Sequence, residues 1–152
     1  MSFINKALLV FAIATLIFFG NRAFQSYLGN QAQSQLAFEI YDLKNGLERA
    51  AETQKPIIAD YSAFWCPSCR KLDEQVFAND KVADLIKQHF IFVSIDHDSQ
   101  TGHNFAKQHE LVGFPRVLIL SHESQKITEL PLSFDPDQYY RNLQRVLLAQ
   151  SE

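Results

Sequence analysis

Two cysteines three positions apart are the residues of this chain most suited to chemistry. Cys66 and Cys69 are the only cysteines among the 152 residues, and Pro67 and Ser68 separate them. A structural disulfide framework would spread several cysteines along the chain, so the pair indicates a reactive dithiol or half of a metal site. The spacing lets the second sulfur reach the first within one helical turn, so Cys69 can resolve a mixed disulfide formed on Cys66.

The elements around the pair predict which sulfur is the nucleophile. Residues 57–62 are apolar and partly β-branched, which predicts a buried strand that runs straight into the cysteines, and Pro67 suits the first position of a helix. Free amides and the positive end of the helix dipole stabilise a thiolate at Cys66, which lowers its pKa below the ~8.5 of a free thiol. Cys69, one turn into the helix, is expected to be more buried and less acidic.

A zinc site is the alternative for the cysteines. His97, His103 and His109 are separated by five residues each, at the edge of the usual zinc spacing. The stretch between Cys69 and His103 is far longer than a zinc finger needs. We therefore expect no metal and no cofactor, and we interpret the histidines as surface residues of a loop and a helix.

The rest of the chain predicts an α/β fold, with a central mixed β-sheet flanked by helices on both faces. Strands joined through helices are expected to be parallel, and the last two, joined by a tight turn, antiparallel. Helices are predicted at 40–54, from Pro67 to 78, from Asp80 as N-cap to 90, at 102–110 and from 135 onward, and strands at 57–62, 90–96, 116–120 and 126–132.

The N-terminal segment is apolar on all sides. Fourteen apolar residues at 7–20 lie between Lys6 and Arg22, a length that suits a secretory signal. No convincing cleavage site follows, and a span of 3–24 with both basic side chains reaching the interfaces forms a signal anchor, which we favour. A helix buried in the domain is disfavoured because the run is not amphipathic. The predicted organisation is a signal anchor or signal peptide at 1–24, a polar linker at 25–37 with little to bury, and one domain at 38–152.

Composition narrows the function further. The chain has 47% hydrophobic and 20% charged residues and a net charge of -3 without a basic tract, which fits one globular domain and argues against nucleic-acid binding. Either export interpretation places the domain in an oxidising compartment, where disulfide chemistry occurs.

The segment around the cysteines resembles a known family. The stretch IIADYSAFWCPSC at 57–69 is similar to the active-site strand and helix of the thioredoxin superfamily, with Trp65 before the first cysteine and Asp60 at the position of a buried acid. Residues 112–115 resemble the cis-proline loop of that family. The resemblance covers 40–148 and is strongest to envelope (periplasmic) thioredoxin-like proteins related to the C-terminal domain of the transmembrane disulfide reductase.

This resemblance implies a thiol-disulfide oxidoreductase that acts on disulfides of exported proteins, as a reductase rather than an oxidase. Cys66 would attack, Cys69 would resolve, and Asp60 would accept the proton of Cys69. Pro115, in cis, would shape a groove that pairs with an extended substrate, and Trp65 and Phe114 would border it. The implied partners are exported proteins with disulfides and a membrane electron donor. The implied location is the inner membrane with the domain facing the periplasm, or the periplasm itself after cleavage.

Several alternatives stay open. The strand at 90–96 lacks the lysine that pairs with the buried acid in thioredoxins, so we expect Asp60 to be more strongly protonated; Asp60 as a strand-end cap is the other interpretation. The bulky Phe114 before the proline suits the core or a groove wall. The alternative functions are a non-catalytic binding or assembly factor with a structural disulfide, and a disulfide oxidase or isomerase.

Overall fold

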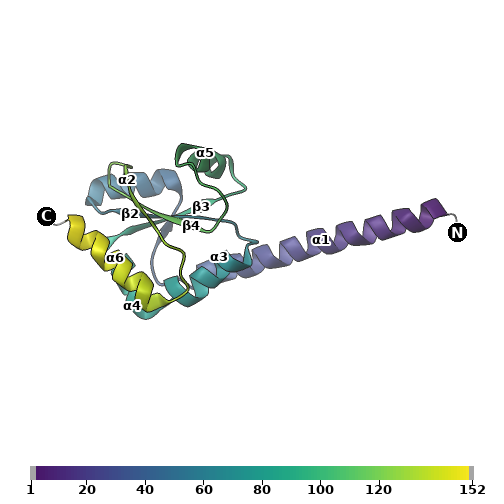
Figure 1. Cartoon of the computed structure of the whole chain (residues 1–152), viewed down its shortest axis with the longest axis horizontal. Coiled ribbons are helices and arrows are strands. Elements are labelled where there is room, and N and C mark those ends of the chain that lie inside the picture. Colours follow the sequence, from purple (N-terminus) through teal and green to yellow (C-terminus); the bar gives the residue numbers. More distant parts are fainter. Residues whose placement is uncertain (1–2, 151–152) are drawn as a thin grey trace.

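The computed structural model describes residues 3–150, which form a mixed sheet with helices on both sides and one long projecting helix (Figure 1). The elements in chain order are α1 (Phe3–Ser34), β1 (Ile40–Tyr41), α2 (Leu43–Thr53), β2 (Ile57–Ser62), α3 (Pro67–Leu72), the π-helical turn η1 (Asp73–Phe77), α4 (Asp80–His89), β3 (Ile91–Asp96), α5 (Gln100–Gln108), β4 (Arg116–Leu120), β5 (Lys126–Leu130) and α6 (Pro136–Gln150).

The sheet is mixed, as the sequence predicts. Its strand order is β1-β3-β2-β4-β5. Both β1 and β2 run parallel to β3, whereas β4 is antiparallel to β2 and to β5. This topology places β2, which leads into the cysteines, between β3 and β4 in the middle of the sheet.

Alternation along β2 divides the core into two layers. Ile58 packs with residues of η1, α4 and α6 on one face, and Ile57 packs with residues of α2 and α5 on the other. Both side chains are fully buried. Because side chains alternate along a strand, Asp60 belongs to the face of Ile58, the same face on which α3 lies.

The first predicted helix begins later than expected. Residues 40–41 form a short parallel strand against Phe92 and Val93 instead of a helical turn. The helix starts after Asp42, whose side chain accepts a hydrogen bond from the backbone amide of Asn45. This N-cap marks the start of the helix, so the two residues before it are free to form a strand. The sequence predicts a helix there because Ile40 lies at helical spacing from the apolar residues that follow.

Other element ends differ by one to two residues. Asn79, and not Asp80, caps α4, because the Asn79 side chain accepts from the Lys81 amide. Ser99 caps α5, which therefore begins at Gln100, two residues before the predicted helix at 102–110. The last strand ends at Leu130, before Pro131, whose ring cannot donate to a ladder.

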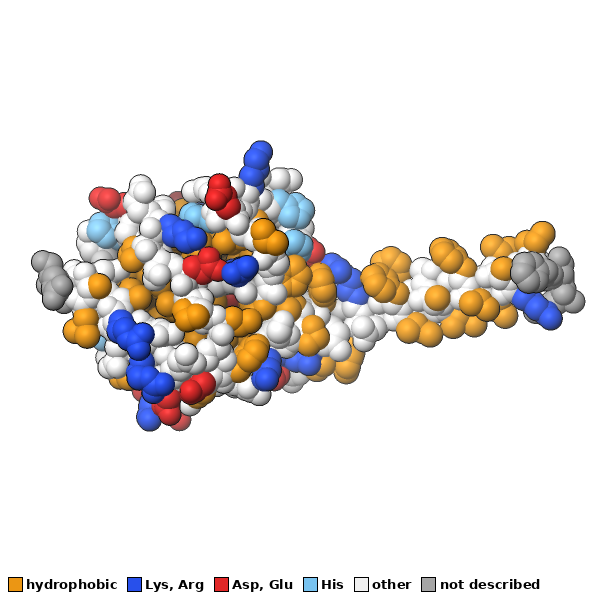
Figure 2. Space-filling model, in the orientation of Figure 1, with side chains coloured by type: hydrophobic (Ala, Val, Ile, Leu, Met, Phe, Trp, Pro, Cys, Tyr) orange, Lys and Arg blue, Asp and Glu red, His pale blue; other side chains and the backbone are white. Residues whose placement is uncertain are grey.

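The N-terminal helix is longer than its apolar run. The predicted polar linker is helical up to Ser34, and although most of its residues are exposed or half-buried, Ala32 is only 7% exposed, so the segment packs against the domain as part of α1. By length and composition α1 is able to cross a membrane: its most apolar window has a mean hydropathy of 1.9, and none of that window is buried against the rest of residues 3–150 (Figures 1 and 2). Residues 1–2 and 151–152 of the predicted segments lie outside the described residues.

Candidate active site

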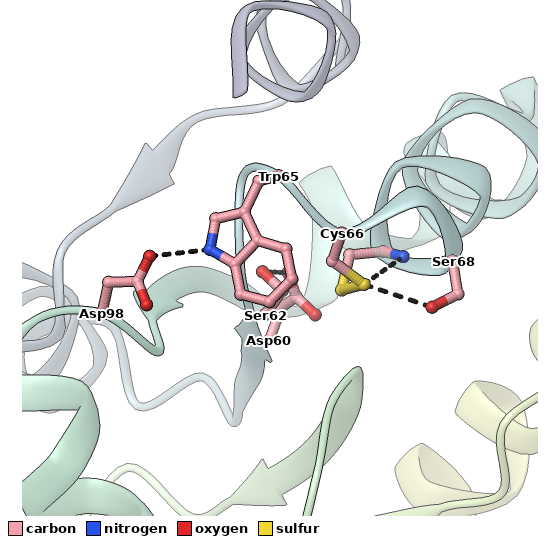
Figure 3. The surroundings of a disulfide bond; sticks show 7 residues. Asp60, Ser62, Trp65, Cys66, Ser68 and Asp98 are labelled. Carbon is pink, nitrogen blue, oxygen red and sulfur yellow. Dashed lines mark hydrogen bonds between the residues drawn. A yellow bond between two sulfur atoms is a disulfide. The ribbon is translucent and has the colours of Figure 1, made fainter. Parts of the chain in front are cut away.

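Cys66 and Cys69 form a disulfide at the N-terminus of α3 (Figure 3). Cys66 is the N-cap, and its Sγ accepts a hydrogen bond from the Cys69 backbone amide at 3.2 Å. Pro67 occupies the first turn, as predicted. The Ser68 hydroxyl lies 3.1 Å from the same sulfur. The Cys66 sulfur therefore sits where helix-end amides and a hydroxyl can stabilise negative charge on it.

The two cysteines are almost equally buried. The exposed fractions are 5% for Cys66 and 4% for Cys69, so the expected difference in burial is absent in the disulfide form. The disulfide holds both cysteines in one apolar cluster, and the side chains of Trp65 and Phe114 pack against this cluster.

Trp65 is held by three partners. Its indole Nε1 donates to Asp98 Oδ2 at 2.7 Å (Figure 3). Its ring meets the Phe114 ring edge-on at 5.4 Å, and the Arg22 guanidinium of α1 lies 4.4 Å from the ring centroid. The indole thus has a fixed orientation beside the disulfide.

The loop before β4 borders the cysteines. The Phe114–Pro115 peptide bond is cis, and Gly113 has a φ of 72°, a value that favours glycine. Pro115 is buried, and Phe114 is half-buried between the site and the core around α5. A cavity of about 580 Å³ opens beside Phe114 and Pro115 and extends to Leu132 and Tyr139.

Asp60 is buried on β2, and none of the basic side chains in residues 3–150 forms an ion pair with it. Its exposed fraction is 2%, and burial raises its pKa from 3.8 to about 7, although the Ser62 hydroxyl, which donates to Oδ2 at 2.8 Å, opposes this shift. Its neighbour on β3 is Ser94, which supplies no charge. The missing lysine therefore leaves burial as the dominant influence on this carboxyl.

A second buried acid, Asp73, is not among the site residues predicted from the sequence. It begins η1, four residues beyond Cys69, and is 7% exposed. Burial, then repulsion from Asp60 and Glu74, raises its pKa to about 8. The signal that could have found it is the spacing from Cys69, since residues four apart share a helix face. Two buried carboxyls, one on the strand that leads into the cysteines and one four residues beyond Cys69, are thus largely protonated below pH 7 and can exchange protons near neutrality.

The histidines lie in a turn and on a helix, as predicted, but one of them also contacts the site. His97 is half-buried in the turn after β3, where it lies against the Phe114 ring at 4.6 Å and its Nδ1 is 2.5 Å from the Tyr61 hydroxyl. His103 is exposed, and His109 packs on Phe105. Within residues 3–150 there is no group of three or more His, Cys, Asp or Glu side chains that could hold a metal ion.

A Cys-x-x-Cys disulfide at the head of a helix, beside a cis-proline loop and near a buried carboxyl on the central strand, defines the thioredoxin-like class of fold and site. The sequence profile of the thioredoxin-like family matches residues 38–121, and the chain belongs to this family. The matched region contains β2, the cysteines and the cis-proline.

Individual relatives are distant. The chain is 24% identical over 92 residues to the thiol:disulfide interchange protein DsbD of Campylobacter jejuni, which covers 57% of this chain but only 16% of that protein. A thioredoxin from Thermus thermophilus superposes with a TM-score of 0.67 at 18% identity, covering 74% of this chain and 88% of the other. The C-terminal domain of Neisseria meningitidis DsbD in the oxidised form gives 0.55 at 18% identity, covering 70% and 98%. At these identities the structures establish the fold.

Proposed function

We propose that this protein is a thiol-disulfide oxidoreductase that reduces disulfides of exported proteins on the outer side of the inner membrane. The observation that carries the proposal is the Cys66 sulfur at the N-cap of α3, bonded to Cys69, with the buried Asp60 beside it (Figure 3). Such an arrangement provides an attacking thiolate, a resolving thiol and a proton acceptor in one place.

The reaction follows from this geometry in two displacements. The Cys66 thiolate attacks one sulfur of the substrate disulfide, a mixed disulfide forms, and the other substrate sulfur leaves as a thiolate that takes up a proton. Cys69 then loses its proton to a buried carboxylate, attacks the Cys66 sulfur and releases the second substrate thiol. Two electrons pass to the substrate, and the Cys66–Cys69 disulfide results.

Another protein must restore the dithiol. A dithiol protein of the membrane can do so by the same exchange in reverse, and the resemblance to part of DsbD supports a donor of this kind. The apolar α1 supports an attachment to the membrane, on which such a donor would act. The roles implied by the family resemblance are part of this proposal. The proton acceptor is Asp60, and the substrate groove is formed by Pro115 and bordered by Trp65 and Phe114.

The standard potential of the Cys66–Cys69 couple tests the direction of electron flow. The full-length protein in detergent is equilibrated with glutathione buffers, and the oxidised fraction is measured by thiol alkylation. A potential near about -270 mV supports a reductase, whereas one near about -120 mV identifies an oxidant and contradicts the proposal.

A non-catalytic binding factor is the second candidate, and the burial of both cysteines favours it. In that case the disulfide has a structural role and the cavity beside Pro115 holds a client. Replacing Cys66 with Ser would then leave client binding intact, whereas it abolishes turnover in the enzyme.

A further inference from the structure

We propose that α1 is retained as a membrane anchor and that its second half is built into the active-site edge, so that Trp65 and the dithiol are held at the bilayer surface. This inference rests on the proposed membrane attachment, but not on the direction of electron flow. Its basis is a set of contacts between α1 and the loop that carries the cysteines.

At Gly29 the backbone of α1 comes very close to this loop. A Cβ added there would lie far inside 3.0 Å of the Phe64 backbone carbonyl oxygen, closer than real Cβ atoms come. Gly20, nine residues earlier in the same helix, has open space around it. The absent side chain at position 29 therefore allows the helix backbone to rest on the residue next to Trp65.

Arg22 joins α1 to Trp65 directly. Its Nη2 donates to Asp98 Oδ2 at 2.5 Å, the same oxygen that accepts from the Trp65 indole. The guanidinium also lies over the indole ring. One basic side chain of the helix thus contacts the indole and its hydrogen-bond acceptor at once.

The contact continues along the next three turns of α1. Gln25 accepts a hydrogen bond from Arg70 of α3 at 2.8 Å. Ala32 is buried, and Gln33 donates to Ser94 at 2.9 Å, on the strand next to Asp60. A flexible tether would form no such series, so the domain and the second half of α1 move as one body.

The length of the apolar half sets the height of the site. Residues 3–20, at a rise of 1.5 Å each, measure roughly 27 Å, close to the ~30 Å hydrocarbon layer. Arg22 then lies at the headgroups, where basic and indole side chains are stable. Because Arg22 touches Trp65, the indole lies at that depth too. Figure 1 agrees, since α3 begins at the end of the domain from which α1 projects.

This placement restricts the protein partner. Because Cys66 directly follows Trp65, its sulfur lies close to the layer next to the bilayer, so a protein that exchanges disulfides with it must present its own sulfur atoms close to that layer. A dithiol protein embedded in the membrane meets this condition, whereas a freely diffusing one meets it only at the bilayer surface.

Trp65 is the only tryptophan of the chain, which makes its depth measurable. The oxidised full-length protein is placed in phosphatidylcholine vesicles that carry a nitroxide either on the headgroup or near the end of the acyl chain. We expect the headgroup nitroxide to quench Trp65 at least about twofold more than the deep one, as an interfacial indole requires. Equal weak quenching by both labels would overturn the inference.

Matched variants separate docking from simple tethering. Gly29→Leu should abolish the headgroup quenching, whereas Gly20→Leu should keep it, since position 20 is open. Arg22→Ala should weaken the quenching, and Arg22→Lys should restore part of it because the charge remains. Quenching that is the same in all four variants would refute the docking. A mature protein that lacks all residues before Gln25 would refute the retained anchor. None of these fluorescence measurements requires catalytic turnover. A protein whose Trp65 is quenched by the headgroup label but which does not reduce disulfides would therefore refute the proposed function and leave the docking of α1 intact.

Discussion

Replacing Asp60 with Asn should stabilise the protein, and by an amount that depends on pH. The carboxyl is 2% exposed, and burial raises its pKa from 3.8 to about 7. A raised pKa means that the folded state binds the proton more tightly than the unfolded chain. The contribution of Asp60 to wild-type stability is therefore complete below about pH 4, is lost as the pH rises to about 7, and does not change above that.

The magnitude follows from the shift. The pKa of Asp60 is raised by about three units, and at 1.36 kcal/mol per unit the wild-type protein loses about 4 kcal/mol of unfolding free energy between pH 4 and pH 8. The asparagine side chain does not ionise, so the variant does not lose this free energy. The advantage of Asp60→Asn over wild type should grow by that amount over this range. Because Asp73 titrates in both proteins, the difference reports Asp60 together with its repulsion of Asp73.

Urea unfolding of the oxidised full-length protein in detergent, followed by Trp65 fluorescence, measures this difference at several pH values. Asp84→Asn is the control, because Asp84 is exposed on α4 and its replacement should shift stability by the same small amount at every pH. A gain for Asp60→Asn that does not change with pH, or a loss of stability at pH 8, would refute the reasoning.

Three further outcomes are expected. Asp60→Asn should slow insulin reduction by about 100-fold at pH 7, as the loss of a general base does, and an unchanged rate would remove Asp60 from the proton path. Cys69→Ser should accumulate a dithiothreitol-sensitive adduct with a disulfide substrate and Cys66→Ser should not; adducts in neither variant would contradict the assigned order of attack. Gly46→Ala should destabilise the domain by about 1–3 kcal/mol, because the new Cβ would collide with Val93, while Gly20→Ala should be neutral in urea unfolding.

Much of the fold could be predicted because its signals are local. The apolar run of β2, Pro67 at the head of α3, and the tight turn before β5 lie within a few residues of what they determine. The two-residue strand β1 gave no such signal, since its pairing with Phe92 is made across the sheet.

The site residues that lie close together in the sequence could also be predicted, whereas those brought together by the fold could not. The cysteines and Asp60 lie on one continuous stretch, so their spacing placed them together. Asp73 resembles an ordinary helix-surface acid in sequence, and its burial arises from the packing of η1 against the sheet. The docking of α1 depends on Arg22 meeting Asp98, 76 residues away, and no local pattern contains that contact.

The acidity of the Cys66 thiol is the most direct test of a catalytic dithiol. Both buried carboxyls are protonated below pH 7 and so do not oppose a thiolate there, whereas the helix N-terminus and Ser68 favour it. The rate of iodoacetamide alkylation of the reduced protein, measured against pH, should rise with an apparent pKa clearly below about 8.5. A midpoint at or above the value of a free thiol would contradict the account.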